Sequence, residues 1–384
     1  MLKWIGGGIL ILAAIGAGLF FFVIPARVDA RMNVVIAHEP FEISAAARAL
    51  HATIGVADLH ADTMLWMRDP LKRHARGHVD LPRLKDGGAA LQVFTAVTKT
   101  PSGLNYDGND SDTDDLTALM IAERWPVATW GSLFARADYQ AGRLADLERR
   151  ANGAFIYVKT AQQLRGALAA NALAGIYGIE GAHPLEGELD NIDRLYQSGM
   201  RVMGLQHFFD NALGGSLHGR SGAGLTPFGR DAVKRAIATG VIIDVAHSSE
   251  AVVRDVLAIS ARPLIVSHTG LKGHCDSPRN ISDALMKEVA DAGGLVGVGF
   301  WEGAICNPTP DGIAGAIVYA VGLLGTEHVA LGSDFDGAVT APFDASELAA
   351  LTQALINAGL DDQTIRAVMG ENAIRFFLEN LPAE

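Results

Sequence analysis

The chain has 384 residues, of which 49% are hydrophobic and 19% charged, and its formal net charge is −12. This apolar content excludes intrinsic disorder, because the chain has enough apolar side chains to bury a core. The acidic balance argues against a nucleic-acid partner, and we expect none, since phosphate backbones are bound by surfaces rich in lysine and arginine.

The first predicted element is an apolar segment at the N-terminus. No residue from 4 to 24 is charged, and as a helix this segment would be about 31 Å long, the thickness of a bilayer's hydrocarbon core. A secretory signal normally has a shorter apolar region, although the small side chain of Ala30 would allow cleavage before Arg31. We therefore expect a transmembrane anchor or signal segment at 1–25, a spacer at 26–42 and the folded domain at 43–384.

Either interpretation of the N-terminal segment places the folded domain on the extracytoplasmic side, in the periplasm or outside the cell. The domain is anchored through residues 4–24 if the segment stays, and it is secreted if the segment is cleaved.

After about residue 40, short apolar runs alternate with longer amphipathic segments. The apolar runs predict strands at 55–60, 89–97, 174–180, 201–207, 241–247, 263–268, 294–300 and 328–334. The amphipathic segments predict helices at 188–198, 226–239, 248–260, 282–292 and 311–324. Eight strand-plus-helix units favour one α/β domain, a TIM-like (β/α)8 barrel. A doubly wound sheet is the alternative, but no G-x-G-x-x-G motif follows the first strand.

The least regular stretch is an insertion at 101–152, after the second predicted strand. Residues 107–112 resemble a calcium-binding loop, but Asp112 stands where that loop needs glycine and Ala118 where it needs a bidentate glutamate. We therefore predict a solvated acidic loop that leads into a long helix. The insertion gives no support for a second domain.

Titratable side chains stand at the ends of six of the eight predicted strands. They are His60, Asp62, Glu180, His207, His247, His268 and Asp334. Because the carboxyl ends of barrel strands meet at one face, we expect these side chains to converge there. Imidazole and carboxylate ligands suit zinc or a similar divalent ion. Seven candidates exceed the needs of one ion, so the pattern predicts two ions bridged by a carboxylate.

Each candidate also has a structural interpretation. A single strand-end histidine is more often a packing residue than a ligand, and Glu180 could cap the following helix. An unpaired carboxylate directly after an apolar strand is costly, however, which favours a ligand. Asp336 could take the place of Asp334, which we favour because it comes first after the strand. Three residues on nearby loops could pack or contact substrate instead: His183, His218 and Arg220.

These motifs resemble those of the membrane dipeptidase (renal dipeptidase) family, dinuclear zinc peptidases related to the amidohydrolase superfamily. The matching segments are 58–62 (DLHAD), 78–82 (HVDLP), 178–181 (GIEG), 205–207 (LQH) with Asn211, 244–247 (DVAH), 267–268 (SH), 278–280 (PRN) and 332–337 (GSDFDG). The segments occur in the family's order from about residue 50 to 380.

The resemblance implies a set of protein ligands for each of two zinc ions. His60 and Asp62 would bind one ion, His247 and His268 the other, and Glu180 would bridge them. A hydroxide between the ions would attack the scissile carbonyl.

The resemblance also implies roles for three further residues. His207 would polarise the carbonyl and stabilise the oxyanion, and Asp334 would orient the hydroxide and pass its proton to the leaving amine. Arg279 would pair with the C-terminal carboxylate of a dipeptide. Tolerance of a C-terminal D-residue and a homodimer are further implications of the family.

Two alternatives remain at this point. A lactonase or deaminase could use the same barrel, but many such enzymes carry His-x-His on strand one and a carboxylated lysine on strand four. Here Asp62 takes the second position, and no lysine occurs in 201–207. A non-catalytic, membrane-tethered binding protein would be expected to have lost ligands. The two cysteines, Cys275 and Cys306, are too few for a disulfide framework, and we expect both to be unpaired.

Overall fold

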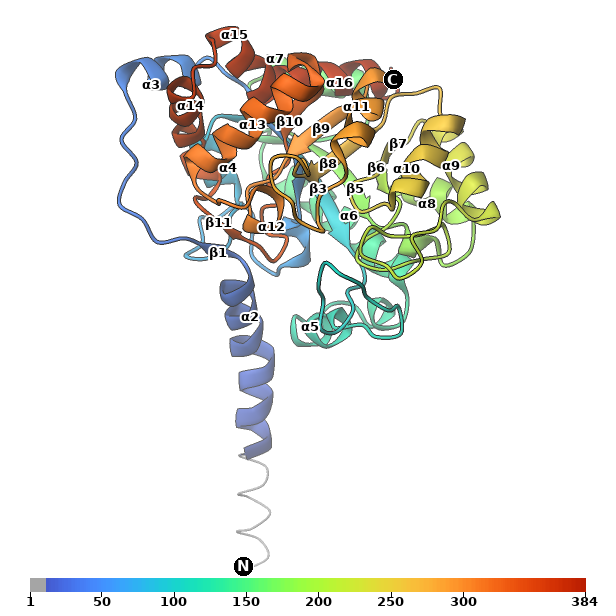
Figure 1. Cartoon of the computed structure of the whole chain (residues 1–384). Helices are drawn as coiled ribbons and strands as arrows, with labels where there is room; N and C mark the ends of the chain where they lie inside the picture. Colours follow the sequence, from blue (N-terminus) through green and yellow to red (C-terminus); the bar gives the residue numbers. More distant parts are fainter. Residues whose placement is uncertain (1–11) are drawn as a thin grey trace, which may run out of the picture.

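Eight parallel strands close into a barrel in the computed structural model, which describes residues 12–384 (Figure 1). The strands are β2 (Val56–Ala61), β3 (Ala89–Val97), β5 (Leu173–Glu180), β6 (Met200–Gly204), β7 (Ile242–Asp244), β8 (Ile265–Thr269), β9 (Leu295–Val298) and β10 (Val329–Leu331). Pairing of β3 with β5, from Leu91 and Ala174 to Val97 and Glu180, joins the two ends of the sheet. The predicted barrel is therefore confirmed, and all eight predicted strands are present.

A ninth parallel strand, β4 (Phe155–Val158), was not predicted. It pairs with the first half of β5, whereas β6 pairs with the second half, so β4 lies outside the closed ring. The strand has only four residues, and it follows four residues after the long helix α6 (Leu133–Arg150). Neither its length nor its pattern separates it from a loop in the sequence.

Helices surround the barrel, and the five predicted from amphipathic patterns are all present. These are α8 (Asp190–Ser198), α9 (Pro227–Thr239), α10 (Glu250–Ile259), α11 (Asp283–Asp291) and α13 (Pro310–Leu324). The helix α9 begins as its sequence predicts, with Pro227 in the first turn and the Thr226 hydroxyl accepting from the Gly229 amide at 3.0 Å. The remaining helices of the domain are α3 (Ala45–His51), α4 (Leu81–Asp86), α7 (Ala161–Ala169), α12 (Glu302–Ile305), α14 (Leu348–Asn357), α15 (Asp362–Arg366) and α16 (Asn372–Asn380).

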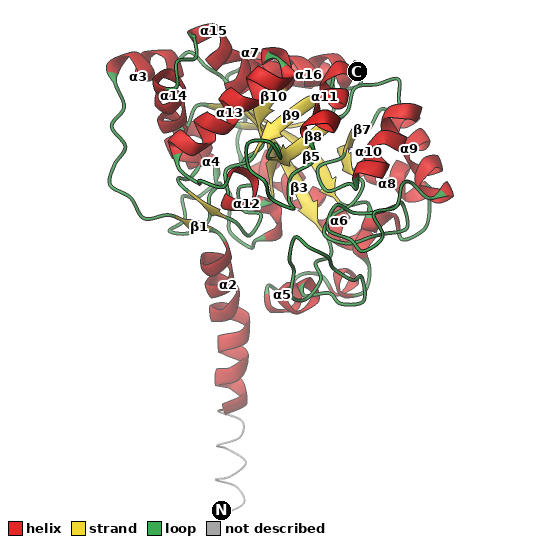
Figure 2. Cartoon of the chain, in the orientation of Figure 1, coloured by secondary structure: helices red, strands yellow, loops and turns green. Residues whose placement is uncertain are grey.

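The insertion after β3 forms the helices α5 (Leu116–Ala122) and α6 (Leu133–Arg150), of which α6 is the long helix expected there. Figure 2 shows the arrows of β3 and β5 pointing toward the end of the domain that carries α5. The N-terminal helix projects from the same end. The insertion and the N-terminal helix therefore both lie at the carboxyl ends of the strands, where barrel active sites are found.

The N-terminal helix runs from Leu12 to Met32 and is long and apolar enough to cross a membrane. Residues 4–11 of the predicted membrane segment lie outside the described residues. The last part of the helix, α2 (Ile24–Met32), continues through Pro25 to the domain. Directly after it, β1 (Val34–Val35) pairs in parallel with β11 (Thr340–Ala341), so the chain segment after the helix is joined to the barrel domain.

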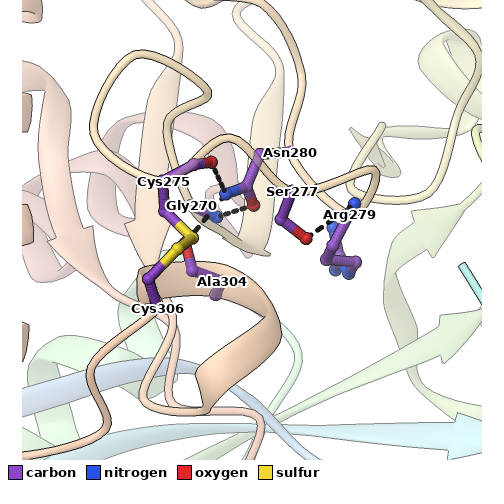
Figure 3. The surroundings of a disulfide bond; sticks show 7 residues. All are labelled: Gly270, Cys275, Ser277, Arg279, Asn280, Ala304 and Cys306. Atoms are coloured by element: carbon purple, nitrogen blue, oxygen red, sulfur yellow. Dashed lines mark hydrogen bonds between the residues drawn. A yellow bond between two sulfur atoms is a disulfide. The ribbon is translucent and has the colours of Figure 1, made fainter.

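The expectation of two free thiols is wrong, because Cys275 and Cys306 form a disulfide (Figure 3). Cys275 lies in the loop after β8 and Cys306 directly after α12, and their Cα atoms are 5.6 Å apart. The cysteines are 31 residues apart in sequence, but β8 and β9 are neighbours in the barrel, so the loops that follow them meet. Counting cysteines alone does not reveal this proximity.

Candidate metal centre and active site

The strand-end residues predicted from the sequence come together at the carboxyl ends of the barrel strands. Glu180 is the last residue of β5 and His268 lies near the end of β8. His60 lies within β2, one residue before its end, and the other four stand one to three residues beyond their strands, where the backbone leaves the barrel. All seven are buried: His60, Asp62, Glu180, His207, His247, His268 and Asp334.

The carboxylate of Glu180 is the centre of this cluster. Its Oε1 lies 3.0 Å from His247 Nε2, 3.3 Å from His268 Nε2 and 3.5 Å from His60 Nε2. Its Oε2 lies 3.5 Å from His207 Nε2. One carboxylate therefore faces four imidazole rings that come from four different strands.

Three overlapping groups of side chains could each hold a metal ion, and in each group the candidate ligand atoms lie within 4.8 Å of one another. The groups are His60 with Asp62 and Glu180; Glu180 with His207 and His247; and His60 with His268 and Asp334. Among residues 12–384, no such group includes the acidic loop at 107–112. The sequence interpretation of that loop is consistent with its exposed Asp107 and Asp112 side chains.

Hydrogen bonds behind the cluster orient two of the rings. The Ser267 hydroxyl donates to Asp244 Oδ2 at 2.6 Å, so its oxygen is left to accept from Nδ1 of His268 at 2.9 Å and of His60 at 3.2 Å. A proton on each Nδ1 leaves each Nε2 with a free lone pair directed at the cluster. Outer hydrogen bonds of this kind are typical of metal-binding histidines.

The close approach of the His247 and His268 rings also indicates a site for a cation. Their Nε2 atoms are 2.9 Å apart and both are buried. Burial, followed by the positive charge of Arg279, lowers the pKa of His247 well below its usual value and so disfavours a charged ring. Two imidazole nitrogens at such a distance repel each other through their lone pairs unless a cation or a proton lies between them.

The buried negative charge of the cluster also fits bound cations. Burial, reinforced by the negative charge of Asp62, raises the pKa of Glu180 well above its usual value. Burial raises the pKa of Asp334 to about 8. Burial alone would lower the pKa of His60, but the charges of Glu180, Asp62 and Asp334 outweigh it and raise this pKa to about 10. The residues of the cluster therefore fit divalent cations, which would neutralise these carboxylates.

Sequence reasoning did not assign roles to Ser267, Asp244 or Thr95, although the first two lie in quoted motifs. Thr95 of β3 donates from Oγ1 to Asp62 Oδ1 at 2.6 Å. It lies mid-strand in an apolar run, where threonine is also a common strand residue. Only its position on the interior face of β3 brings it to the cluster.

Asp334 lies in a loop with an unusual backbone. Its φ is 60°, and Asp336 and Ala338 also have left-handed φ values of 63° and 61°. Non-glycine residues rarely adopt this region, and such strain is found mainly at functional sites. Asp336, the alternative candidate, instead pairs with Arg68 at 2.7 Å and accepts from the His78 amide at 2.7 Å. The loop therefore has a buried ion pair beneath Asp334.

Arg279 is buried beside the cluster. Its Nη1 donates to the Ala246 carbonyl at 3.1 Å and its Nη2 to the His268 carbonyl at 2.9 Å. The guanidinium lies 5.2 Å from the centre of the Trp301 ring. Nη2 also lies 3.4 Å from His247 Nε2, so two of the five N–H groups of the guanidinium remain for a ligand. Burial lowers the pKa of Arg279 from its usual value.

A cavity of about 620 Å³ opens over the cluster. From the cluster it is lined by Asp62, Glu180, His207, His247, Arg279 and Asp334. The three loop residues with uncertain assignments do not line it. His183 stacks on Phe209 with ring centres 4.4 Å apart, His218 packs between Tyr106 and His247, and exposed Arg220 pairs with Asp110 at 2.9 Å.

Comparison with known proteins matches this chain to a family of metallopeptidases, which is consistent with a metal site. The family model of membrane dipeptidase, peptidase family M19, matches residues 44–381. A protein of Schizosaccharomyces pombe described as an uncharacterized dipeptidase is 26% identical over 336 residues, which cover 83% of this chain and 79% of that protein.

Solved structures agree in fold along nearly the whole chain. A metallopeptidase of Rhodobacter sphaeroides, liganded with a phosphinate mimic of the dipeptide L-Ala-D-Ala, has a TM-score of 0.70 and 26% identity, covering 86% of this chain and 99% of its own. A dipeptidase described as a metallopeptidase of family M19 has a TM-score of 0.71 and 26% identity, covering 86% of this chain and 100% of its own.

Proposed function

The chain belongs to the membrane dipeptidase family, peptidase family M19, and from that premise we propose that it is a zinc dipeptidase anchored at the outer face of a membrane. Its substrates would be dipeptides with a free C-terminal carboxylate, including those with a C-terminal D-residue. The observation that carries the proposal is the convergence of the histidine Nε2 atoms on the carboxylate of Glu180.

The proposed ligands divide between two zinc ions. His60 and Asp62 would hold one ion, His247 and His268 the other, and Glu180 would bridge them. Bound zinc would supply a hydroxide nucleophile at neutral pH by lowering the pKa of water. The Ser267 hydroxyl supports both halves of the site, because it holds the rings of His60 and His268 from behind.

The protein's own groups would then act on the bound dipeptide. His207 Nδ1 lies 3.4 Å from the Lys99 carbonyl, too far for a strong hydrogen bond. Nε2 can therefore carry the ring proton and donate to the oxyanion as negative charge develops on the scissile carbonyl. Asp334 lines the cavity beside His60, where it would orient the nucleophile and transfer a proton to the leaving amine.

Arg279 would select the C-terminal end of the substrate. It is held rigidly by two main-chain carbonyls and by the face of Trp301, and it is directed into the cavity. A preorganised guanidinium binds a carboxylate through two parallel hydrogen bonds. Of the comparisons, the Rhodobacter sphaeroides structure with its mimic of L-Ala-D-Ala supports this substrate class.

The disulfide supports an extracytoplasmic site of action. Disulfides persist in oxidising compartments and are rare in the cytosol. The bond between Cys275 and Cys306 therefore favours the periplasm or the cell exterior. The apolar helix that ends at Met32 would hold the domain there. The proposed division remains a membrane segment at 1–25, a spacer at 26–42, of which residues 26–32 continue the helix, and a catalytic domain at 43–384.

The test is a hydrolysis screen with the zinc-loaded protein. L,L- and L,D-dipeptides should be cleaved, whereas N-acylated dipeptides, amidated dipeptides and lactones should be poor substrates. Removing metal with a chelator should abolish cleavage, and adding zinc should restore it. A preference for lactones would favour the alternative amidohydrolase-type reaction, and the absence of any turnover would favour a binding protein.

A further inference from the structure

The cavity of about 620 Å³ over the metal-site residues reaches as far as the N-terminal helix. At its far end it is lined by four residues of the N-terminal helix: Phe20, Ile24, Val28 and Met32. Two of them, Phe20 and Ile24, fall within the predicted membrane segment at 4–24. A single cavity therefore connects the metal-site residues with the part of the helix that would lie in the bilayer.

The insertion provides the facing wall of this outer part of the cavity. Leu104 precedes α5, and Leu116, Leu119 and Ala122 of α5 also line the cavity. The guanidinium of Arg124, just after α5, lies 4.7 Å from the centre of the Phe22 ring on the N-terminal helix. Figure 1 shows α5 beside the upper part of this helix. The outer cavity is thus an apolar passage between two helices.

Buried polar contacts fix the N-terminal helix to the catalytic domain. Asp29 is only 2% exposed and accepts from Arg76 Nε at 2.7 Å, from Asn33 Nδ2 at 2.9 Å and pairs with Arg68 Nε at 3.0 Å. Asn33 Oδ1 in turn accepts from the amide of Ala338 at 3.0 Å. Loss of Asp29 would leave the buried Arg68 without one of its two carboxylate partners, which is costly.

These contacts favour retention of the N-terminal segment over its cleavage. Cleavage before Arg31 would remove Asp29 together with the apolar wall formed by Phe20, Ile24 and Val28. A signal segment that is cleaved during secretion would not be expected to form buried ion pairs with the mature domain. The buried ion pairs and hydrogen bonds of this helix are typical of an element that stays in the mature protein.

We propose that the N-terminal helix is a retained wall of the substrate-binding site, and that the passage between it and α5 binds the long apolar chain of an amphiphilic dipeptide residing at the membrane surface. This inference rests on the proposed dipeptidase function. The polar dipeptide end would lie at Arg279 and the metal-site residues, while the apolar chain would extend along Val28 and Ile24 toward the bilayer. Each methylene group buried there adds favourable transfer free energy.

The test uses the full-length, zinc-loaded protein in phosphatidylcholine vesicles. The two substrates are L-alanyl-L-alanine and 2-aminododecanoyl-L-alanine, which keeps the free amine and carboxylate but carries a decyl side chain. We expect kcat/KM for the long-chain substrate to exceed that for alanyl-alanine by about tenfold or more. Ile24→Ser and Val28→Ser should each lower this ratio by about threefold to tenfold.

The matched control is Leu19→Ser, since Leu19 is an exposed apolar residue of the same helix that does not line the cavity. This variant should keep the wild-type ratio. A wild-type ratio near one, or an equal loss in Leu19→Ser, overturns the inference while alanyl-alanine cleavage still supports the proposed function. Mass spectrometry of the membrane-bound protein gives a second test, and a mature chain that begins at Arg31 also overturns the inference.

Discussion

The Nε2 atom of His247 lies 3.0 Å from Oε1 of Glu180, and both atoms are buried at the end of the barrel. Oε1 of the same carboxylate also faces His268 and His60, whereas Oε2 faces His207. Since His60 belongs to one proposed ligand pair and His247 and His268 to the other, the carboxylate of Glu180 lies within reach of both proposed ion positions. Under the proposed assignment, both halves of the site would need the carboxylate charge of Glu180.

Glu180→Gln tests this bridging role. The amide keeps the shape of the side chain but removes the charge and one acceptor, so zinc content should fall from about two ions to one or fewer per chain. Dipeptide turnover should drop by about a hundredfold or more. Metal analysis by mass spectrometry and steady-state kinetics measure the two effects. Glu188→Gln, at an exposed position of the following loop, is the matched control. A Glu180→Gln protein that holds both ions and turns over normally would remove Glu180 from the mechanism.

Arg279→Lys tests recognition of the substrate's carboxylate. Lysine keeps the positive charge but cannot form two parallel hydrogen bonds, so KM for alanyl-alanine should rise by about tenfold to a hundredfold, with a smaller fall in kcat. The preference for alanyl-alanine over its C-terminal amide should shrink to the same extent. Arg220→Lys, which alters an exposed arginine paired with Asp110, should change neither value. An undiminished preference in Arg279→Lys would contradict the assigned role.

The sequence predicts the barrel and its polar face because both depend on a repeated pattern. Buried parallel strands read as apolar runs, and a charged residue such as Glu180 directly after such a run stands out. The runs that hold His60, His247 and His268 could be recognised for the same reason. Family motifs then added Arg279, which no strand pattern identifies.

Features that depend on the meeting of distant loops could not be predicted in this way. The bond between Cys275 and Cys306 requires that the loops after β8 and β9 face each other, which only the closed barrel establishes. The contacts of Asp29 with Arg68 and Arg76 join a segment taken as a spacer to the loop after β2. Local sequence carries no signal for such contacts, because each residue alone resembles an ordinary surface charge.

The disulfide should contribute to stability more than to catalysis. It links the loop that carries Arg279 to α12, but Asn280 joins the same two segments, since its Nδ2 donates to the Cys275 carbonyl at 2.9 Å and to the Ala304 carbonyl at 2.8 Å. Replacing both cysteines by serine should lower the free energy of unfolding by about 2–4 kcal/mol. Turnover at moderate temperature should change by less than about threefold.

Chemical denaturation with and without a reductant measures the stability, and thiol titration of the unfolded, unreduced protein should detect no free thiol. Two titratable thiols would contradict the bond.

Glu123 should make the insertion beside the cavity sensitive to pH. Burial raises its pKa to about 7, although its carboxylate accepts from the Met67 amide at 3.2 Å and from Trp125 Nε1 at 3.0 Å. A carboxyl group whose pKa is higher in the folded than in the unfolded state stabilises the fold at low pH, and this contribution is lost as the pH rises through the folded-state value. The α5 region should therefore be most stable below about pH 4.5, should open more readily as the pH rises from there to about 7, and should change little above that value.

Hydrogen exchange of the amides in 116–125, corrected for the intrinsic pH dependence of exchange, measures this opening. Protection should fall between pH 5 and pH 8 in the wild type. Glu123→Gln keeps one of the two accepting oxygens and cannot ionise, so its protection, although lower overall, should be nearly constant over the same range. Glu188→Gln should retain the wild-type profile, because that glutamate is exposed. Equal slopes in the wild type and in Glu123→Gln would show that another group controls the opening. Since α5 forms one wall of the apolar passage, a confirmed slope would make binding of long-chain substrates weaker in alkaline solution than in mildly acidic solution.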